Sequence, residues 1–288
     1  MASDSTPSIR CVDTNQYGLS HRGASYVIEA DQVGLVEAGT PRAASILLDT
    51  LQGRDVAYIY VTHVHLDHAG AAGAIAVRHP EATVIAHPRA IKHLADPRRL
   101  VEGVRSASPD LFPFYGEPTP IPQRQLHAAA DGERFDLGRG AVIEAIHAPG
   151  HAPHHVCFFE HGSSVLFTGD AVGNHGVPID VPLTVPPRFD LAAALETLDR
   201  LTDLRPTSLA FTHFGQVGGD ASALFDAYRH ALIAWFGRIR SLREGTDSEH
   251  VVSSVLSEPK YGALEPSDRY SIEMCVRGAL ATLEAQDV

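Results

Sequence analysis

Four side chains that can bind a metal ion lie within six consecutive positions of the chain. Residues 62–70 read Thr-His-Val-His-Leu-Asp-His-Ala-Gly, and the potential ligands are His63, His65, Asp67 and His68. Imidazole nitrogens together with a carboxylate oxygen suit zinc, and also iron or manganese. Because crowding these polar groups destabilises a fold unless something binds them, the segment predicts a metal site.

A strand must deliver these ligands, and the flanking residues predict one. The apolar run 56–61 leads directly into the cluster and is typical of a buried strand. Three later strand-like runs also end near a potential ligand, and these ligands are His151, Asp170 and His213. Because loops that leave strand ends gather at one edge of an α/β sheet, the four segments point to one common site.

The remaining pattern also favours an α/β fold. Runs 26–30 and 34–37 predict a hairpin, and Thr40 with Pro41 predicts the start of a helix that continues to about residue 51. Residues 108–125 contain five prolines and three aromatic residues, which predicts a long irregular loop beside the site. After residue 219 the pattern is mainly helical.

A long amphipathic helix is predicted near the C-terminus. Apolar residues recur at spacings of three and four between positions 224 and 242. We expect this stripe to pack on the core of its own domain. An interface between copies of the chain, which would make a homo-oligomer, is the alternative.

Composition narrows the class of protein. The 288 residues are 44% hydrophobic and 20% charged, as in soluble globular proteins. The net charge of −12 and the lack of a basic run disfavour a nucleic-acid partner. Three widely spaced cysteines, no signal sequence and no membrane-spanning run predict a cytoplasmic protein with a small-molecule substrate and no membrane partner.

Four short motifs that contain potential ligands follow one another along the chain, and they are THVHLDHAG, APGHAPHH, FTGD and THFG. This order resembles the metallo-β-lactamase superfamily, and within it the glyoxalase II-like hydrolase branch. The resemblance covers about residues 20–215 and implies a four-layer αββα sandwich with a mainly helical C-terminal extension. The expected division is a tail with the first strand (1–15), a catalytic domain (16–218) and a helical region packed on that domain (219–288).

The resemblance also implies how the ligands are shared between two metal ions, which we expect to be Zn²⁺, with iron or manganese as alternatives. The first ion would take His63, His65 and His151, the second would take Asp67, His68 and His213, and Asp170 would bridge the two. The ions would lie about 3.5–4 Å apart, as in other two-metal hydrolytic sites. A bridging hydroxide would then attack a carbonyl group, with Asp67 orienting the hydroxide.

Four further residues are candidates for supporting roles. Relatives often have an aspartate where this chain has Glu37, which keeps the charge on a longer arm and is expected to support metal binding. His154 is expected to contact the substrate in the pocket lining or to donate a hydrogen bond to a metal ligand, and an ordinary strand-entry histidine is the alternative. His175 and Tyr115 are candidate substrate contacts, and Tyr115 is also a candidate oxyanion donor.

We expect a dinuclear metallo-hydrolase that cleaves a small ester, thioester or lactone. An alternative with different chemistry is a mononuclear-iron oxidoreductase similar to persulfide dioxygenases. The presence of the ligands for both metal ions disfavours this alternative. Hydrolysis of a β-lactam or a phosphodiester is disfavoured by the missing export signal and the acidic composition. A non-catalytic binding module is disfavoured because all seven ligands are present.

Overall fold

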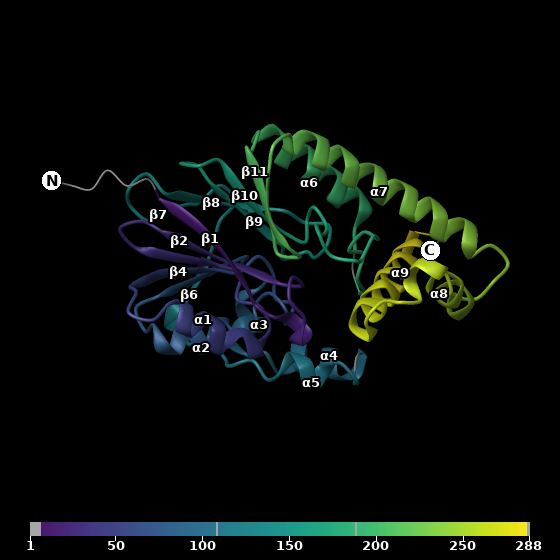
Figure 1. The fold of residues 1–288 in the computed structure, drawn as a ribbon, viewed down its shortest axis with the longest axis horizontal. Helices are drawn as coiled ribbons and strands as arrows, with labels where there is room; N and C mark the ends of the chain where they lie inside the picture. Colours follow the sequence, from purple (N-terminus) through teal and green to yellow (C-terminus); the bar gives the residue numbers. More distant parts are fainter. Residues whose placement is uncertain (1–6, 108, 188, 287–288) are drawn as a thin grey trace.

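The computed structural model of the protein describes residues 7–107, 109–187 and 189–286. Two six-stranded sheets lie at its centre, with the orders β1-β2-β3-β4-β5-β6 and β12-β11-β10-β9-β8-β7 (Figure 1). The strands of the first sheet are β1 (Ser8–Asp13), β2 (Ala24–Glu29), β3 (Val33–Val36), β4 (Val56–Tyr60), β5 (Thr83–Ala86) and β6 (Leu126–Ala128). Those of the second are β7 (Arg134–Asp136), β8 (Val142–His147), β9 (Val156–Glu160), β10 (Val165–Gly169), β11 (Ser208–Phe211) and β12 (Gly215–Gly218).

Helices cover the outer face of each sheet, so that the chain has four layers in the order αββα (Figure 1). The helices on the first sheet are α1 (Ala44–Thr50), α2 (Ala72–Arg78) and α3 (Ile91–Ala95). The second sheet is covered by α6 (Leu191–Asp203) and α7 (Ala221–Leu242). A separate core of buried side chains fills the space between the two sheets. The predicted four-layer fold is therefore confirmed.

Successive residues of β4 belong to different cores, which explains why the run 56–61 is apolar throughout. Ile59 is fully buried against the helices of the first layer. Tyr60 is fully buried between the sheets, where its ring packs on Phe135 and Phe158. Because side chains alternate between the two faces of a strand, a strand covered on both faces needs apolar residues at nearly every position.

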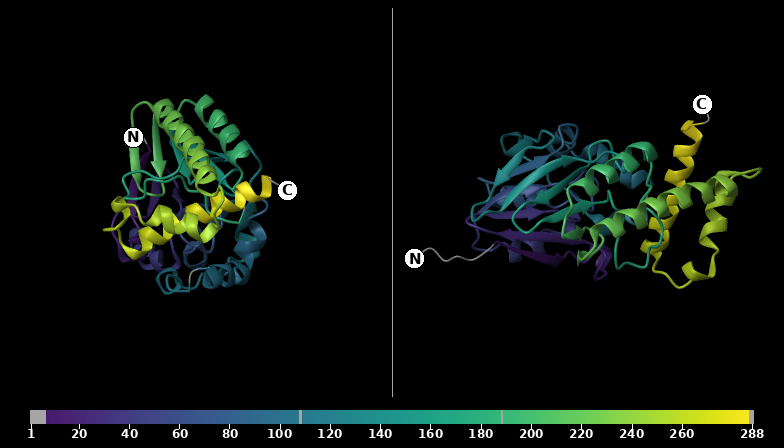
Figure 2. Two further views of the ribbon diagram at one scale, coloured as in Figure 1. Left: turned by 90° about the vertical axis from the view of Figure 1, so that its right-hand side faces the viewer. Right: turned by 90° about the horizontal axis from the view of Figure 1, so that it is seen from above.

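The last part of the chain is helical, as predicted, and consists of α7, α8 (Ser248–Leu256) and α9 (Pro266–Gln286). These helices extend past one end of the sheets (Figure 2). Asp220 caps α7, because its carboxylate accepts hydrogen bonds from two backbone N–H groups of the first turn. The apolar stripe of α7 packs into one core with α8 and α9, so the prediction that it serves its own domain is confirmed. In the described part of the chain, no helix has the length and apolar character needed to cross a bilayer.

One local expectation is wrong. The segment 108–125 is not wholly irregular, because it contains the short helix α5 (Phe112–Tyr115), which follows α4 (Arg98–Ala107). The predicted helix start at Thr40 and Pro41 is confirmed, because a 3-10 turn at Pro41–Ala43 leads directly into α1, although the Thr40 side chain makes no capping hydrogen bond. The expected division of the chain at residues 15 and 218 stays a prediction.

Gly278 allows α9 to approach the segment that precedes α6. A Cβ atom at this position would lie 1.7 Å from the carbonyl oxygen of Thr184, whereas a Cβ atom on Gly237 in α7 would meet nothing within 4 Å. We expect Gly278→Ala to lower the free energy of unfolding by about 1–3 kcal/mol, because the backbone must shift. Gly237→Ala should leave it unchanged or raise it by up to ~1 kcal/mol, because alanine favours helices. Urea denaturation compares the two variants, and equal midpoints would contradict the close packing of α9.

Candidate metal centre

The predicted ligands follow four strands that end at the same edge of the sandwich. β8, β10 and β11 run in one direction, because β8 and β10 each pair antiparallel with β9, and β11 pairs parallel with β10. Their C-terminal ends carry His151, Asp170 and His213 to one edge of the second sheet. β4 brings the segment 62–70 from the first sheet, and a backbone hydrogen bond from the N–H of Val156 joins the sheets there.

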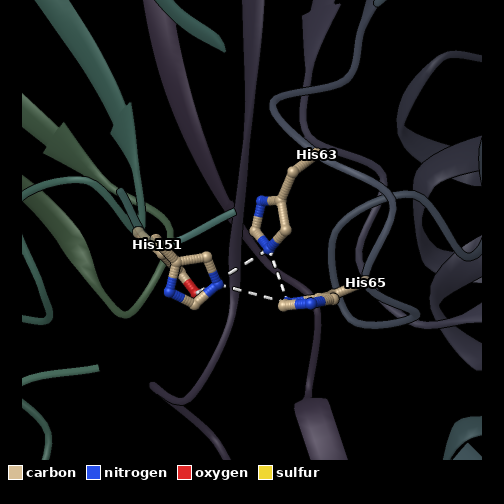
Figure 3. Close-up of side chains that lie close together, drawn as sticks. His63, His65 and His151 are labelled. Atoms are coloured by element: carbon tan, nitrogen blue, oxygen red, sulfur yellow. Dashed lines mark hydrogen bonds and ion pairs between the residues drawn. The ribbon is translucent and has the colours of Figure 1, made fainter. Parts of the chain in front are cut away.

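The first group of potential ligands contains three histidines from two loops. The rings of His63, His65 and His151 point toward one another (Figure 3). His65 Nδ1 lies 2.8 Å from His63 Nε2 and 3.2 Å from His151 Nε2. Asp170 completes this group, and its Oδ2 atom lies 3.3 Å from His151 Nε2. All four ligand atoms lie within 4.8 Å of one another, so one metal ion could contact them together.

The second group consists of Asp67, His68 and His213. The Oδ2 atom of Asp67 lies 3.9 Å from His68 Nε2 and 3.7 Å from His213 Nε2. The other oxygen of Asp170, Oδ1, faces this group at 3.4 Å from His68 Nε2 and 3.6 Å from His213 Nε2. The two oxygens of one carboxylate therefore face two different groups of ligands.

Two buried polar atoms indicate that the centre is built for a ligand. Among the described residues, neither His68 Nε2 nor Asp170 Oδ1 has a hydrogen-bond partner. Leaving a buried polar atom unpaired costs about 1–3 kcal/mol. Both atoms are of the kinds that bind zinc, iron or manganese, and both face the centre. The residues present therefore fit a divalent metal ion.

Backbone carbonyl groups hold two of the imidazoles from behind. His151 Nδ1 lies 2.9 Å from the carbonyl oxygen of Leu183, and His213 Nδ1 lies 2.7 Å from that of Arg22. A carbonyl oxygen can only accept, so in each ring Nδ1 carries the proton and donates it. The unprotonated Nε2 atom is then free to face the centre, which is the usual arrangement in protein metal sites.

Glu37 lies behind the ligands and contacts His68 on the side of the ring that faces away from the centre. Its side chain is buried, and its Oε1 atom accepts hydrogen bonds from the hydroxyl groups of Thr62 and Thr212. The same oxygen lies 3.1 Å from His68 Nδ1. The backbone of Glu37 has a φ angle of 66°, a region that residues other than glycine seldom adopt. The expectation that Glu37 assists the ligands agrees with this contact.

The charges at the centre favour metal binding. Burial and neighbouring imidazoles lower the pKa of His63 well below its ordinary value. Burial raises the pKa of Asp170, but the surrounding imidazoles outweigh it and hold this pKa well below the ordinary range. For His68, burial is outweighed by three nearby carboxylates, which raise the pKa. Neutral imidazoles and ionised carboxylates are the forms that bind metal, so the lowered pKa values of His63 and Asp170 favour metal binding.

The sequence offered no sign of two residues that reach the centre from the N-terminal part of the chain. Gln16 Nε2 donates a hydrogen bond of 3.0 Å to Asp67 Oδ2. The hydroxyl oxygen of Tyr17 lies 2.6 Å from that of Tyr115, one of the predicted substrate contacts. Both tyrosines line the cavity described below, and neither Gln16 nor Tyr17 belongs to a motif that could have revealed it.

The two other predicted contacts have different surroundings. His154 lines the cavity, and burial together with His151 lowers the pKa of its ring to about 4. His175 is exposed, and its ring stacks on Phe211 at 5.4 Å between centroids. The structure does not bring this ring into the cavity lining, because the chain after Asp170 turns the ring toward β11. The expectation of a substrate contact through His175 is therefore not supported.

A cavity of about 660 Å³ opens directly onto both groups of ligands. Its lining includes His65 and His151 from the first group, Asp67 and His213 from the second, and Asp170. The volume lies within the range of about 300–1,000 Å³ that is usual for small-molecule sites. A small substrate can therefore reach the point where the two groups meet.

Comparison with curated proteins gives partial matches. The chain is 25% identical to putative diflavin flavoprotein A 1 of Thermosynechococcus vestitus, with 98% of this chain and 50% of that protein covered. It is 32% identical to the metallo-β-lactamase fold-containing protein ST1585 of Sulfurisphaera tokodaii, over 56% of this chain and 61% of that protein. It is 27% identical to an atrochrysone carboxyl ACP thioesterase of Aspergillus novofumigatus, over 57% of this chain and 39% of that protein. The chain thus spans 39–61% of the length of these relatives.

The fold and the family agree. The crystal structure of ST1585 from Sulfolobus tokodaii superposes with a TM-score of 0.71 at 22% identity, covering 94% of this chain and 98% of that one. A family model described as the metallo-beta-lactamase superfamily matches residues 21–213. Because this match covers more than half of the chain and includes every predicted metal ligand, the chain belongs to the metallo-β-lactamase superfamily.

Proposed function

We propose that this chain is a dinuclear metal-dependent hydrolase of small esters, thioesters or lactones. The observation that carries the proposal is the position of Asp170, whose two oxygens face two separate groups of ligands. One carboxylate in this position can bridge two divalent ions, for which zinc is the first candidate and iron or manganese the alternatives. The ion in the first group would be held by three histidines, and the ion in the second by Asp67, His68 and His213.

The bound ions would supply a water molecule that loses its proton near neutral pH, and a positive charge that stabilises an oxyanion. Asp67 lines the cavity, and one of its oxygens already accepts a hydrogen bond from Gln16. This contact fixes the carboxylate, which can accept a hydrogen bond from the nucleophilic water and orient it toward the substrate carbonyl. Asp67 is therefore the proposed catalytic residue.

The paired tyrosines offer a hydrogen-bond donor to the substrate. Burial raises the pKa of both Tyr17 and Tyr115, so both phenols stay protonated at neutral pH. The pair contains two O–H groups but makes one mutual hydrogen bond, so one O–H remains available. It can donate to the carbonyl oxygen or to the leaving group. His154, in the same lining, is proposed only as a pocket wall.

A redox enzyme is the second candidate, because the relative named a diflavin flavoprotein matches 98% of this chain. Such a protein would use the same ligands to hold iron. The thioesterase among the relatives favours the hydrolase instead. The geometry of Asp170 is compatible with both, so metal content and reaction must separate them.

Removing the bridging carboxylate tests the core of the proposal. Asp170→Ala should lower the metal content from about two ions per chain toward one and should abolish most of the hydrolytic rate, because neither group keeps its shared ligand. Elemental analysis and hydrolysis of an acyl thioester measure the two effects. Asp180→Ala, an exposed carboxylate that pairs with Lys260, is the matched control. Unchanged metal content and activity in Asp170→Ala would refute the assignment.

The identity of the metal separates the two candidate functions. We expect protein purified without chelators to hold two divalent ions per chain and to hydrolyse thioesters, esters or lactones after loading with zinc. Treatment with a chelator should abolish this activity, and zinc should restore it. Iron in place of zinc, as one or two ions per chain, with oxygen consumption and no hydrolysis, would overturn the hydrolase in favour of the iron oxidoreductase.

The tyrosine pair gives a finer test. Tyr115→Phe should lower kcat by about tenfold, since one hydrogen bond to the substrate is lost, while the metal content stays the same. Tyr17→Phe should have a smaller effect, because Tyr115 keeps its hydroxyl. Tyr58→Phe, which alters a ring packed against Tyr60 and Phe135 away from the cavity, is the control. Equal activity of all three variants would exclude a role for the pair.

A further inference from the structure

The cavity at the metal centre continues along one face of α4. The residues of this helix that line it recur at helical spacing, and they are Arg99, Leu100, Gly103, Val104 and Ala107. Val101 is the buried residue of the helix. The apolar face of α4 therefore lines the cavity, and Leu100 in it also packs against the core of the first sheet.

The wall opposite α4 is apolar as well. It comes from the segment before α6 and from α9, which lies at the same end of the molecule as α4 (Figure 1). Its apolar side chains are Val177, Ile179, Leu183, Val185 and Met274. We call the space between these residues and α4 the apolar chamber. It is continuous with the part of the cavity that contains the ligands.

Polar contacts join α9 to α4 and pair the charges of Arg22 and Asp268 beside the apolar chamber. The hydroxyl of Tyr270 in α9 donates a hydrogen bond of 3.2 Å to the carbonyl oxygen of Ala107 in α4. The guanidinium of Arg22 donates two hydrogen bonds of 2.9 Å to the carboxylate of Asp268, which is almost fully buried. Arg99 is the charged residue that α4 brings to the lining, and it is exposed to solvent.

We propose that the apolar chamber binds the acyl arm of the substrate, and that the substrate is an ester or thioester of a fatty acid. This inference rests on the proposed function, because it places the scissile carbonyl at the ligands. An apolar arm gains free energy when it leaves water for walls of this kind, whereas a polar arm would lose hydrogen bonds there. The thiol carriers of acyl thioesters are polar, so the acyl side is the part that fits.

The length of the acyl chain is the first variable to test. With the zinc-loaded full-length protein, kcat/KM for acyl thioesters should rise by up to about fourfold for each added methylene, and should stop rising when the apolar chamber is full. The series runs from two to twelve carbons. A matched series that lengthens the thiol side should show no such rise.

A tryptophan at position 103 is the second variable. A Cβ atom on Gly103 would meet nothing within 4 Å, so Gly103→Trp can be accommodated while it narrows the apolar chamber. We expect it to lower kcat/KM for decanoyl thioester at least tenfold and to leave acetyl thioester within twofold. Glu102→Trp, on the exposed face of the same helix, should change neither. Val104→Asp, which places a charge in the wall, should repeat the effect of Gly103→Trp if that variant folds poorly.

Decanoate binding separates this inference from the proposed function. Calorimetry should detect binding to the native protein and to Glu102→Trp, and weakened binding to Gly103→Trp. Binding without hydrolysis of any acyl substrate would retain the apolar chamber and reject the hydrolase. Hydrolysis that is independent of acyl length, with no decanoate binding, would retain the hydrolase and overturn the apolar chamber.

Discussion

A carboxylate buried among imidazoles is the constraint on which the surrounding structure depends. Asp170 is 5% exposed, and burying an unpaired carboxylate costs on the order of several kcal/mol. Its two oxygens need positive or metal partners on two sides. Loops from both sheets must therefore meet at this point. Loops meet there because β8, β10 and β11 run in one direction and end at the same edge as β4.

The sequence predicts which residues come together at the centre because their signal is local. Four of them lie within six positions after a strand, and the others follow strands that end at the same edge. Glu37 could also be anticipated, since the resemblance places a carboxylate in the turn after the early hairpin. In each case the residue type and the neighbouring strand carry the information, and no knowledge of distant contacts is needed.

The parts of the site that escaped prediction depend on distant contacts. Gln16 reaches Asp67 across fifty-one positions of sequence, and Tyr17 reaches Tyr115 across ninety-eight. The apolar residues of α4 resemble a core stripe in sequence, and only the position of α9 turns them into a cavity wall. His175 shows the converse, since it is near Asp170 in sequence but its ring stacks on Phe211 and does not line the cavity.

Arg22 contacts both a predicted metal ligand and α9, and it uses different atoms for the two contacts. Its backbone carbonyl accepts from His213, whereas its side chain holds α9 through Asp268. Any amino acid at position 22 would offer the same carbonyl, so substitutions that reshape α9 need not disturb the imidazole. The hydrogen bond that orients His213 is therefore independent of the ion pair that anchors α9, so the packing of α9 and the orientation of the imidazole can change separately.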